Sequence, residues 1–574
     1  MKILLLCHSF NGLAQRLHVE LREAGHAVSV ELDIADAVTE EAVALFNPDL
    51  VVAPFLKRRI PESVWSQRIC LVVHPGPPGD GGPHALDWAI ERGLADWGVT
   101  VLQAVQAYDA GPVWAWRPVR LRPDATKGSL YRHEVSSAAV AAVMEALGRW
   151  RPGASGPASL PALPAESGHW QRAMTAADRR IDWAGDSTAS VLRRLNAADG
   201  APGVLDEAVG TPVRWFDAHA ASAADLARLP PAAPGAFVAR RGPALLRCTT
   251  DGGVWLGHAR RGGVGALKRE AVLAFGDLAE SLPELPLALD HDAASWDELH
   301  YRESGPPGAR VGFLRFDFHN GAMSVRQCAR LCAALDEAAQ RDTQLLVLEG
   351  GREFFSHGIH LHAIEAVSQA GGSAADASMA HIEAIDDVAL AILRRSDRLT
   401  VAALHGNAGA GGCFLALAAD LVWAHGGVVL NPHYRNMGNL HGSEYWTYLL
   451  PRRCGEATAG AILRGRLPMG TAEAQRLGLV DAVLAPDAAT FATALDAAAA
   501  ALAASADLPA RIADKARRRA ADEQARPLAA YRADELAAMR VNFYGFDPSY
   551  HIARHHFVHR KAHAWTPRHL ALHR

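Results

Sequence analysis

A glycine-rich turn between an apolar run and a small-residue segment constrains the fold of this 574-residue chain most strongly. The apolar run 401–404 predicts a buried strand, 406–412 the turn, and 413–419 a helix. The first N–H groups of a helix lack acceptors within it and carry partial positive charge. Glycines also let a substrate approach the backbone closely. This stretch therefore predicts a site for an oxyanion or a phosphate.

A second turn of the same kind lies upstream. Residues 345–349 predict a strand, and GGREFFSHGIHL follows it at 350–361. The two segments together resemble the enoyl-CoA hydratase/isomerase (crotonase) family, whose members carry G-x-x-F-S-A-G-x-D-L and, downstream, G-x-x-x-G-G-G-C-E-L-A. The resemblance implies that the backbone N–H groups of Ile359 and Gly411 form an oxyanion hole for a thioester carbonyl. It also implies that Gly358 and Gly412 contact coenzyme A.

The departures from this family's pattern point to different chemistry. Phe414 and His433 stand where hydratases carry their two catalytic glutamates, so ordinary water addition to an enoyl thioester is not expected. Tyr434 and Glu444 are the polar residues that remain nearby, and both residue types act as general acids or bases when their environment tunes them. We predict that Tyr434 and Glu444 are catalytic. The alternative is that they are loop residues with structural hydrogen bonds.

The N-terminal part of the chain predicts a doubly wound parallel sheet. Apolar runs alternate with helical segments, at 2–6, 27–32, 49–53 and 70–73. No G-x-G-x-x-G follows the first run, so dinucleotide binding is not supported. Ligands bind such sheets at the carboxyl ends of the strands, where His74 stands.

Residues around His74 resemble the 10-formyltetrahydrofolate-dependent formyltransferases and hydrolases, which carry N-x-H-x-S-x-L-P and, further along the chain, D-x-G-x-I/V. His74 and Asp109, at a separation of 109 − 74 = 35, match the catalytic histidine and aspartate of that family. The resemblance implies a catalytic role for both. Val72 occupies the position of the family's asparagine and cannot hydrogen-bond a formyl oxygen. The alternative is a structural His-Pro-Gly turn.

The predicted architecture is an α/β multidomain protein. Residues 151–168, rich in Pro, Ala, Gly and Ser, predict a linker. The segments that follow resemble the junction into the small C-terminal barrel of methionyl-tRNA formyltransferase, and short strands separated by turns fit an OB-like fold. We predict a formyltransferase-like domain at 1–170, an OB-like domain at 171–280, a linker at 281–309, and a crotonase-like domain with a helical C-terminal extension at 310–574.

Composition limits the partners and the compartment. The net charge of −4 gives no excess of basic residues, so nucleic acid is not an expected partner. No apolar run is long enough to cross a membrane, so a membrane is not an expected partner either. Seven scattered cysteines without a CxxC motif indicate a reducing, cytoplasmic location.

Four histidines in the C-terminal extension follow one another at every fourth position: His551, His555, His559 and His563. This spacing predicts a stripe on one face of a helix. No acidic residue or cysteine accompanies the stripe locally, so a packed or solvated face is favoured and no metal site is predicted.

Taken over its whole length, the chain resembles the HypX/HoxX hydrogenase maturation factors. This resemblance rests on the pairing of the two modules and on the segments 431–434, 442–446 and 542–545. That family is associated with making the carbon monoxide ligand of the [NiFe]-hydrogenase active site. The resemblance implies transfer of the formyl group of 10-formyltetrahydrofolate to coenzyme A, followed by decarbonylation of formyl-CoA to CO. Hydrogenase maturation proteins are candidate partners, and Gln15 and Arg132 are candidate contacts for the cofactors in the first domain.

Two alternatives remain open at this stage. One is a pair of separate activities, a formyltetrahydrofolate hydrolase and an acyl-CoA hydrolase or isomerase. The other is a non-enzymatic carrier of a one-carbon unit.

Overall fold

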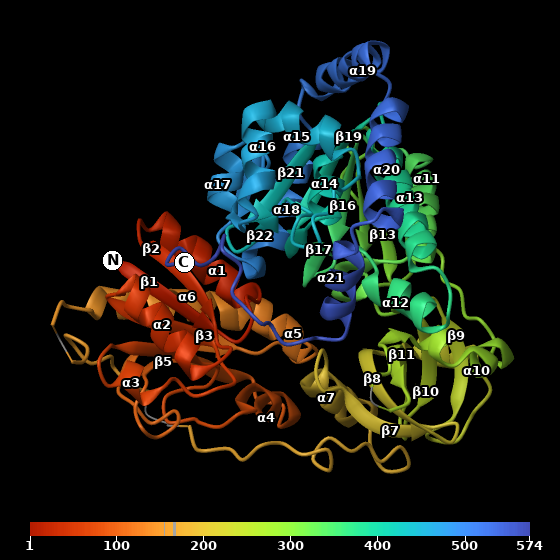
Figure 1. The fold of residues 1–574 in the computed structure, drawn as a ribbon. Helices are drawn as coiled ribbons and strands as arrows, with labels where there is room; N and C mark the ends of the chain where they lie inside the picture. The colour runs from red at the N-terminus through yellow and green to blue at the C-terminus, as the bar shows by residue number, and fades with distance from the viewer. Residues whose placement is uncertain (154, 165–167, 264) are drawn as a thin grey trace. The chain divides into compact units, whose positions relative to one another are not determined.

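The computed structural model describes residues 1–153, 155–164, 168–263 and 265–574. The chain forms two compact units (Figure 1). Unit 1 comprises Met1–Leu285 together with Ala562–Arg574, and unit 2 comprises Pro286–Lys561. The C-terminal segment of the chain therefore belongs to unit 1, whereas the sequence placed it with the crotonase-like domain.

The first part of unit 1 is a six-stranded sheet in the order β2-β1-β3-β4-β5-β6. The first four strands in this order are parallel, and β5 and β6 are antiparallel to their neighbours. Five of the six side chains of β1 are buried, as expected for a strand covered by helices on both faces. The strands are β1 (Lys2–Cys7), β2 (Ala27–Leu32), β3 (Leu50–Phe55), β4 (Cys70–His74), β5 (Asp96–Gln103) and β6 (Val113–Arg120).

Helices and one π-helical segment connect these strands. Asn11 caps α1 by accepting a hydrogen bond from Ala14 N, which fixes the start of the first helix shortly after β1. These elements are α1 (Gly12–Glu23), α2 (Asp36–Phe46), α3 (Glu62–Trp65), α4 (Ala85–Glu91), α5 (Lys127–Leu130), the π-helix η1 (Tyr131–Val135) and α6 (Ser136–Arg149).

The second part of unit 1 is an antiparallel sheet in the order β7-β8-β11-β10-β9, with β12 paired to β11. Its core includes Trp215, which stacks on Phe275 at a centroid distance of 5.3 Å. The elements are α7 (Thr188–Ala198), β7 (Val204–Ala208), β8 (Thr211–Ala220), α8 (Ala223–Ala227), β9 (Phe237–Arg241), β10 (Ala244–Cys248), β11 (Gly253–Arg261), β12 (Arg269–Glu270), α9 (Ala271–Ala274) and α10 (Gly276–Ser281).

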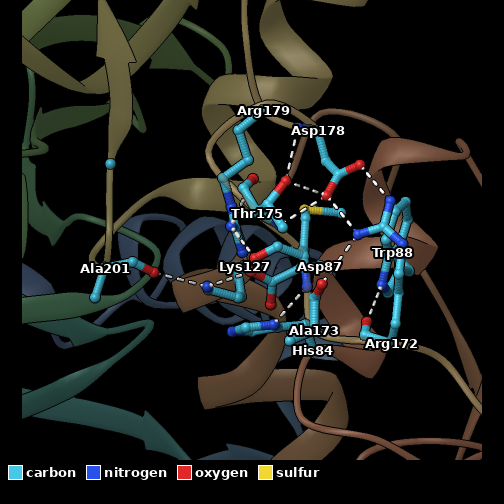
Figure 2. Close-up of polar contacts among 12 residues, drawn as sticks. His84, Asp87, Trp88, Lys127, Arg172, Ala173, Thr175, Asp178, Arg179 and Ala201 are labelled. Carbon is cyan, nitrogen blue, oxygen red and sulfur yellow. Dashed lines mark hydrogen bonds and ion pairs between the residues drawn. The ribbon is translucent and has the colours of Figure 1, made fainter.

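A buried ion-pair network centred on Asp87 joins the two parts of unit 1 (Figure 2). Asp87 on α4 lies 2.8 Å from Nη2 of Arg179 and 3.0 Å from Nζ of Lys127. Lys127 also donates to the carbonyl oxygen of Ala201, beyond α7. Asp87 and Arg179 are both buried, so each charge depends on the other for compensation.

The C-terminal segment of the chain docks beside β2, where Figure 1 places the C-terminus. Glu31 on β2 is fully buried and lies 2.8 Å from Nε2 of His573 and 3.0 Å from Nη2 of Arg574. Thr566 hydrogen-bonds both the Leu32 backbone N–H and the Glu31 carboxylate. This segment thus supplies the partners of a buried carboxylate.

The main sheet of unit 2 has the order β13-β14-β16-β19-β21-β24. All of its neighbours are parallel except β13 and β14. The strand β13 lies within the stretch that the sequence analysis assigned to a linker, so the structured part of unit 2 begins earlier than predicted. The strands are β13 (Leu299–Ser304), β14 (Val311–Phe316), β16 (Leu345–Gly350), β19 (Leu399–Leu404), β21 (Leu421–His425) and β24 (Ala482–Ala485).

Short strands continue from the carboxyl ends of the main-sheet strands. They form a second sheet in the order β17-β20-β22-β23 and a two-stranded pair, β15 with β18. These strands are β15 (Ala322–Met323), β17 (Phe354–Ser356), β18 (Gly358–Ile359), β20 (Asn407–Gly409), β22 (Val429–Asn431) and β23 (Met469–Gly470). Both predicted glycine-rich turns lie in this layer.

Helices account for most of the rest of unit 2. Ser324 and Gln327 form a capping box at the start of α11, consistent with the sequence pattern there. The helices are α11 (Val325–Ala339), α12 (Leu361–Gln369), α13 (Ala374–Leu393), α14 (Gly411–Leu417), α15 (Trp446–Cys454), α16 (Glu456–Gly465), α17 (Thr471–Arg476), α18 (Ala488–Ala503), α19 (Leu508–Ala525), α20 (Leu528–Tyr544) and α21 (Ser549–Val558).

Among the described residues, no individual helix has both the length and the apolar character needed to cross a membrane. One strongly bent pair, α18 with α19, meets that test by length and composition alone.

Candidate functional sites

The first candidate site lies at the carboxyl end of β4, where His74 stands between two carboxylates. Its Nε2 lies 2.8 Å from Oδ2 of Asp80, and its Nδ1 lies 3.8 Å from Oδ1 of Asp109. His74 and Asp80 are both buried. The structure therefore brings the two predicted residues together and adds Asp80, which sequence reasoning missed.

The backbone of this loop explains why Asp80 reaches His74. A Cβ at position 76 would overlap the Asp80 carboxylate and the His74 ring, so only glycine leaves room for their contact. Asp109 has a left-handed backbone (φ 51°) and accepts a hydrogen bond from Gly82 N at 3.1 Å. The sequence signal for Asp80 was its position shortly after His74 in a turn rich in glycine and proline.

Two further predicted residues lie on elements that contact each other. Gln15 is on α1 and donates a hydrogen bond to the Phe10 carbonyl oxygen at 2.9 Å. Arg132 is in the π-helix η1, and α1 packs against this segment. Segments of π-helix are frequent at functional sites, so the position of Arg132 is consistent with its predicted role as a cofactor contact.

Val72 is two positions before His74 on β4, so the two side chains share one face of the sheet.

The second candidate site lies in unit 2, where the two glycine-rich turns meet. A Cβ at position 358 would lie 3.4 Å from the backbone nitrogen of Gly411, so β18 and the start of α14 are adjacent. Gly412 packs so closely on the Ser356 backbone that a side chain there would overlap it. Ala410, which precedes α14, has a positive φ of 48°. Ile359 and Gly411 are thus positioned on neighbouring backbone segments, as an oxyanion hole requires.

Tyr434 and Glu444 are in direct contact beside this backbone. The Tyr434 hydroxyl hydrogen-bonds the Glu444 carboxylate and lies 2.8 Å from the Ser443 carbonyl oxygen. A Cβ at position 411 would overlap Oε1 of Glu444, which places that oxygen against the predicted oxyanion hole. The Tyr434 ring stacks on Phe414 at a centroid distance of 5.1 Å, so the residue that replaces a hydratase glutamate supports the tyrosine.

Comparison with known proteins places these two sites in a family. Residues 21–147 match the family model described as formyl transferase, and residues 312–546 match enoyl-CoA hydratase/isomerase. The hydrogenase maturation factor HoxX of Bradyrhizobium diazoefficiens is 51% identical over 578 aligned residues, which cover 100% of this chain and 97% of the relative. The chain belongs to the HypX/HoxX family of hydrogenase maturation factors.

A solved structure of a HypX protein confirms the fold. The crystal structure of HypX from Aquifex aeolicus in complex with tetrahydrofolic acid superposes with a TM-score of 0.93 at 42% identity, covering 100% of this chain and 99% of the other. A more distant relative, the methionyl-tRNA formyltransferase of Ralstonia nicotianae, is 27% identical over 187 residues, which are 32% of this chain and 56% of the relative. The predicted α/β multidomain class and the resemblance to HypX/HoxX are both confirmed.

Buried carboxyl groups surround the Tyr434–Glu444 pair of this HypX/HoxX family member. Asp386 on α13 accepts a hydrogen bond from the Glu444 backbone N–H at 2.7 Å, and Glu535 on α20 accepts one from the Tyr445 backbone N–H at 2.9 Å. Glu444 and Tyr445 both have left-handed backbones, with φ of 60° and 58°. The two carboxylates therefore hold a strained pair of residues in place, a feature that recurs at active sites.

This cluster changes the acidity of its members. Burial, together with the neighbouring charge of Asp386, raises the pKa of Glu444 well above its usual range. Burial also raises the pKa of Asp386, and it raises the pKa of Glu535 to about 8. Burial and the charge of Glu444 raise the pKa of the Tyr434 phenol well above 10. The Tyr434 hydroxyl donates to Oε2 of Glu444, so a neutral Glu444 can carry its proton on Oε1, the oxygen that lies against the Gly411 backbone.

The C-terminal histidine stripe is shorter than predicted. Helix α21 ends at Val558, so His559 is its C-cap and His563 lies outside the helix, in unit 1. His555 and His559 both contact Glu365 on α12, an acidic partner so distant along the chain that local sequence inspection did not reveal it.

Proposed function

We propose that this protein makes carbon monoxide for hydrogenase maturation in two steps: formyl transfer from 10-formyltetrahydrofolate to coenzyme A, and decarbonylation of formyl-CoA. The observation that carries the proposal is the contact of Glu444 with both Tyr434 and the backbone of Gly411. This contact supports the proposal because it would bring the Glu444 carboxyl close to the oxyanion hole that the resemblance to crotonases implies. A formyl-transferase module in the same chain supplies a reason for a formyl thioester to be the substrate.

The first step uses His74. Asp80 lies 2.8 Å from Nε2 and fixes the orientation of the imidazole, and Nδ1, at 3.8 Å from Asp109 and so outside hydrogen-bond distance, can accept a proton from the attacking coenzyme A thiol. The thiolate sulfur forms a bond to the formyl carbon, and the bond from that carbon to the folate nitrogen breaks. His74 returns the proton to that nitrogen. A thiolate is a strong nucleophile, which reduces the need for the amide donor that Val72 lacks.

The second step uses Glu444. The N–H groups of Ile359 and Gly411 hold the formyl oxygen. As the carbon–sulfur bond breaks, its electron pair stays on sulfur, which takes the proton of the neutral Glu444 carboxyl. The resulting carboxylate takes the formyl proton, and CO and coenzyme A leave with Glu444 neutral again. Tyr434 orients the carboxyl through its hydrogen bond, because a phenol whose pKa lies well above 10 does not serve as the base at neutral pH.

We further propose that the protein works in the cytoplasm together with other hydrogenase maturation proteins. This follows from its relationship to the HoxX maturation factor and from its seven free cysteines, which suit a reducing compartment. Small molecules, the folate and coenzyme A, are its proposed substrates.

The test uses purified protein, 10-formyltetrahydrofolate and coenzyme A, with formyl-CoA and CO both measured. Wild type is expected to release CO, and His74→Ala to form neither product. His26→Ala removes a histidine of the same unit away from β4 and is expected to behave like wild type. Formate without formyl-CoA or CO from the wild-type protein would contradict the proposal and favour separate hydrolase activities. Full hydrogenase maturation by Glu444→Gln in cells would favour a non-enzymatic carrier.

A further inference from the structure

A cluster of metal-ligating side chains lies where α21 packs against α12, outside the catalytic machinery described above. His555 Nδ1 and His559 Nε2 point to the same oxygen, Oε1 of Glu365, at 3.0 and 3.1 Å. One atom from each of these three residues lies within 4.8 Å of the other two. Glu365 is buried, whereas the His555 side chain is 46% exposed, so the cluster opens to solvent on one side.

The geometry of this cluster is close to that of a zinc site. Zinc binds histidine nitrogens and carboxylate oxygens at about 2.0–2.2 Å, so ligand atoms of a tetrahedral site are roughly 3.3 Å apart. The observed contacts of 3.0 and 3.1 Å between the carboxylate oxygen and each histidine nitrogen need to open by only a few tenths of an ångström. Two histidines and one glutamate are a common ligand set for zinc with one open position.

The surroundings of Glu365 also fit a metal ligand. Its second oxygen, Oε2, accepts a hydrogen bond from Nε of the buried Arg554 at 3.0 Å. Arg554 is in turn held by His551, whose other ring nitrogen contacts the Phe543 carbonyl oxygen at 2.9 Å. Partners of this kind orient a ligating carboxylate and leave its other oxygen directed at the metal. Arg554 already balances the negative charge of Glu365, so His555 and His559 are not needed to compensate that charge.

We propose that Glu365, His555 and His559 bind one zinc-class divalent ion, with a fourth position open to solvent. The ion would replace the two ring protons that otherwise face Glu365 Oε1, because histidine ligates in its neutral form. It would tie the last helix of unit 2 to α12, a helix that begins shortly after Ile359.

The test measures metal binding by the full-length, untagged protein after removal of metal with a chelator. Zinc is added, unbound metal is removed by gel filtration, and bound zinc is counted by mass spectrometry. Cobalt(II) then replaces zinc, since its visible absorption reports tetrahedral coordination. Glu365→Gln and His559→Gln each remove one ligand. His556→Gln is the matched control, because His556 is an exposed neighbour on the same helix outside the ligand set.

The expected result is about one zinc per chain in wild type and His556→Gln, with a higher melting temperature when zinc is present. Glu365→Gln and His559→Gln should each lose affinity by roughly tenfold or more, and with it the tetrahedral cobalt spectrum and the zinc-dependent rise in melting temperature. The proposal fails if wild type retains no stoichiometric zinc, or if Glu365→Gln binds zinc as tightly as wild type. Either result would leave the cluster as an ion-pair network only. Folding of each metal-free variant is checked by circular dichroism.

Discussion

Glu444 contacts Tyr434 through one carboxylate oxygen and lies against the Gly411 backbone with the other. The two oxygens of one carboxyl group thus face different parts of the site. One is held by a phenol whose own hydroxyl reaches the Ser443 carbonyl, and the other faces the place where a thioester carbonyl binds in crotonase-like proteins. This relationship connects the unusual sequence of the second module to the acid–base role that we propose for Glu444.

The electrostatics around Glu444 predict the pH dependence of CO formation. Glu444 donates its proton first, so the rate should fall as the pH rises through its raised pKa. Asp386→Asn keeps an acceptor for the Glu444 backbone N–H but removes the negative charge that opposes ionisation. The pKa of Glu444 should then decrease, and the alkaline fall in rate should move to lower pH.

The pH–rate profile of CO release from formyl-CoA checks this prediction. Other charged or titratable groups near Glu444 are Cys328 on α11, Glu535 and Arg532 on α20, Tyr434 and Tyr445, and all are kept in this variant. Glu383→Gln removes a partly exposed carboxylate from the same helix as Asp386 and serves as the control. A profile for Asp386→Asn that overlays wild type, or moves to higher pH, would refute the assignment.

Asp80 should matter for formyl transfer, although no sequence motif marked it. Its carboxylate lies 2.8 Å from His74, closer than that of Asp109. Asp80→Asn should lower kcat for formyl-CoA formation by roughly 10²-fold with little change in KM for the folate, since it acts through the histidine. Asp96→Asn, in an exposed pair with Arg120, is the control. Unchanged kcat in Asp80→Asn would show that the contact has no role in transfer.

Much of the fold and part of each site follow from local sequence patterns. The position of His74 follows from the end of its strand, but β5 runs antiparallel to β4, so Asp109 reaches His74 only through the loop that follows β5. Gly411 and Tyr434 follow β20 and β22, which are neighbouring strands of one sheet. The contacts that sequence could not reveal join distant segments. Asp386 and Glu535 reach the Glu444 loop from helices α13 and α20, and Glu365 on α12 reaches His555 on α21. No periodicity encodes such pairs, because they depend on how whole helices pack.

Domain boundaries were also harder to predict than the elements within them. The strand β13 occurs in a stretch rich in Asp and Pro that looked like a linker, yet Tyr301 is buried in the core. The segment Ala562–Arg574 joins unit 1, where it supplies charged partners for the buried Glu31 of β2. Composition alone does not indicate which unit a terminal segment completes.

Removing Asp87 from its ion-pair network should have a large effect on the stability of unit 1. Asp87→Ala leaves Arg179 buried without its partner and should lower the free energy of unfolding by about 3–5 kcal/mol. Asp178→Ala is the matched control in the same region (Figure 2): its partner Arg172 is largely exposed, so the loss should be much smaller. Denaturant unfolding monitored by tryptophan fluorescence measures both. Equal losses would contradict the distinction between the two pairs.

The C-terminal segment should stabilise unit 1 through Glu31. Deleting His573 and Arg574 removes two partners of a fully buried carboxylate and should cost about 3 kcal/mol. Glu31→Gln in the truncated protein should recover part of this loss, because no charge then remains buried. Leu572→Ala alters an exposed side chain of the same segment and should change little. Truncation without loss of stability would show that the docking contributes nothing.

The most direct test of the account is the conversion of chemically prepared formyl-CoA to CO by the purified protein, detected by haemoglobin difference spectra. Supplying formyl-CoA removes any dependence on the folate site. Wild type and Glu383→Gln should release CO and coenzyme A in equal amounts, and Glu444→Gln should be slower by roughly 10²–10⁴-fold. Release of formate instead of CO, or the same rate of CO release from Glu444→Gln as from wild type, would contradict the proposed chemistry of the Tyr434–Glu444 site.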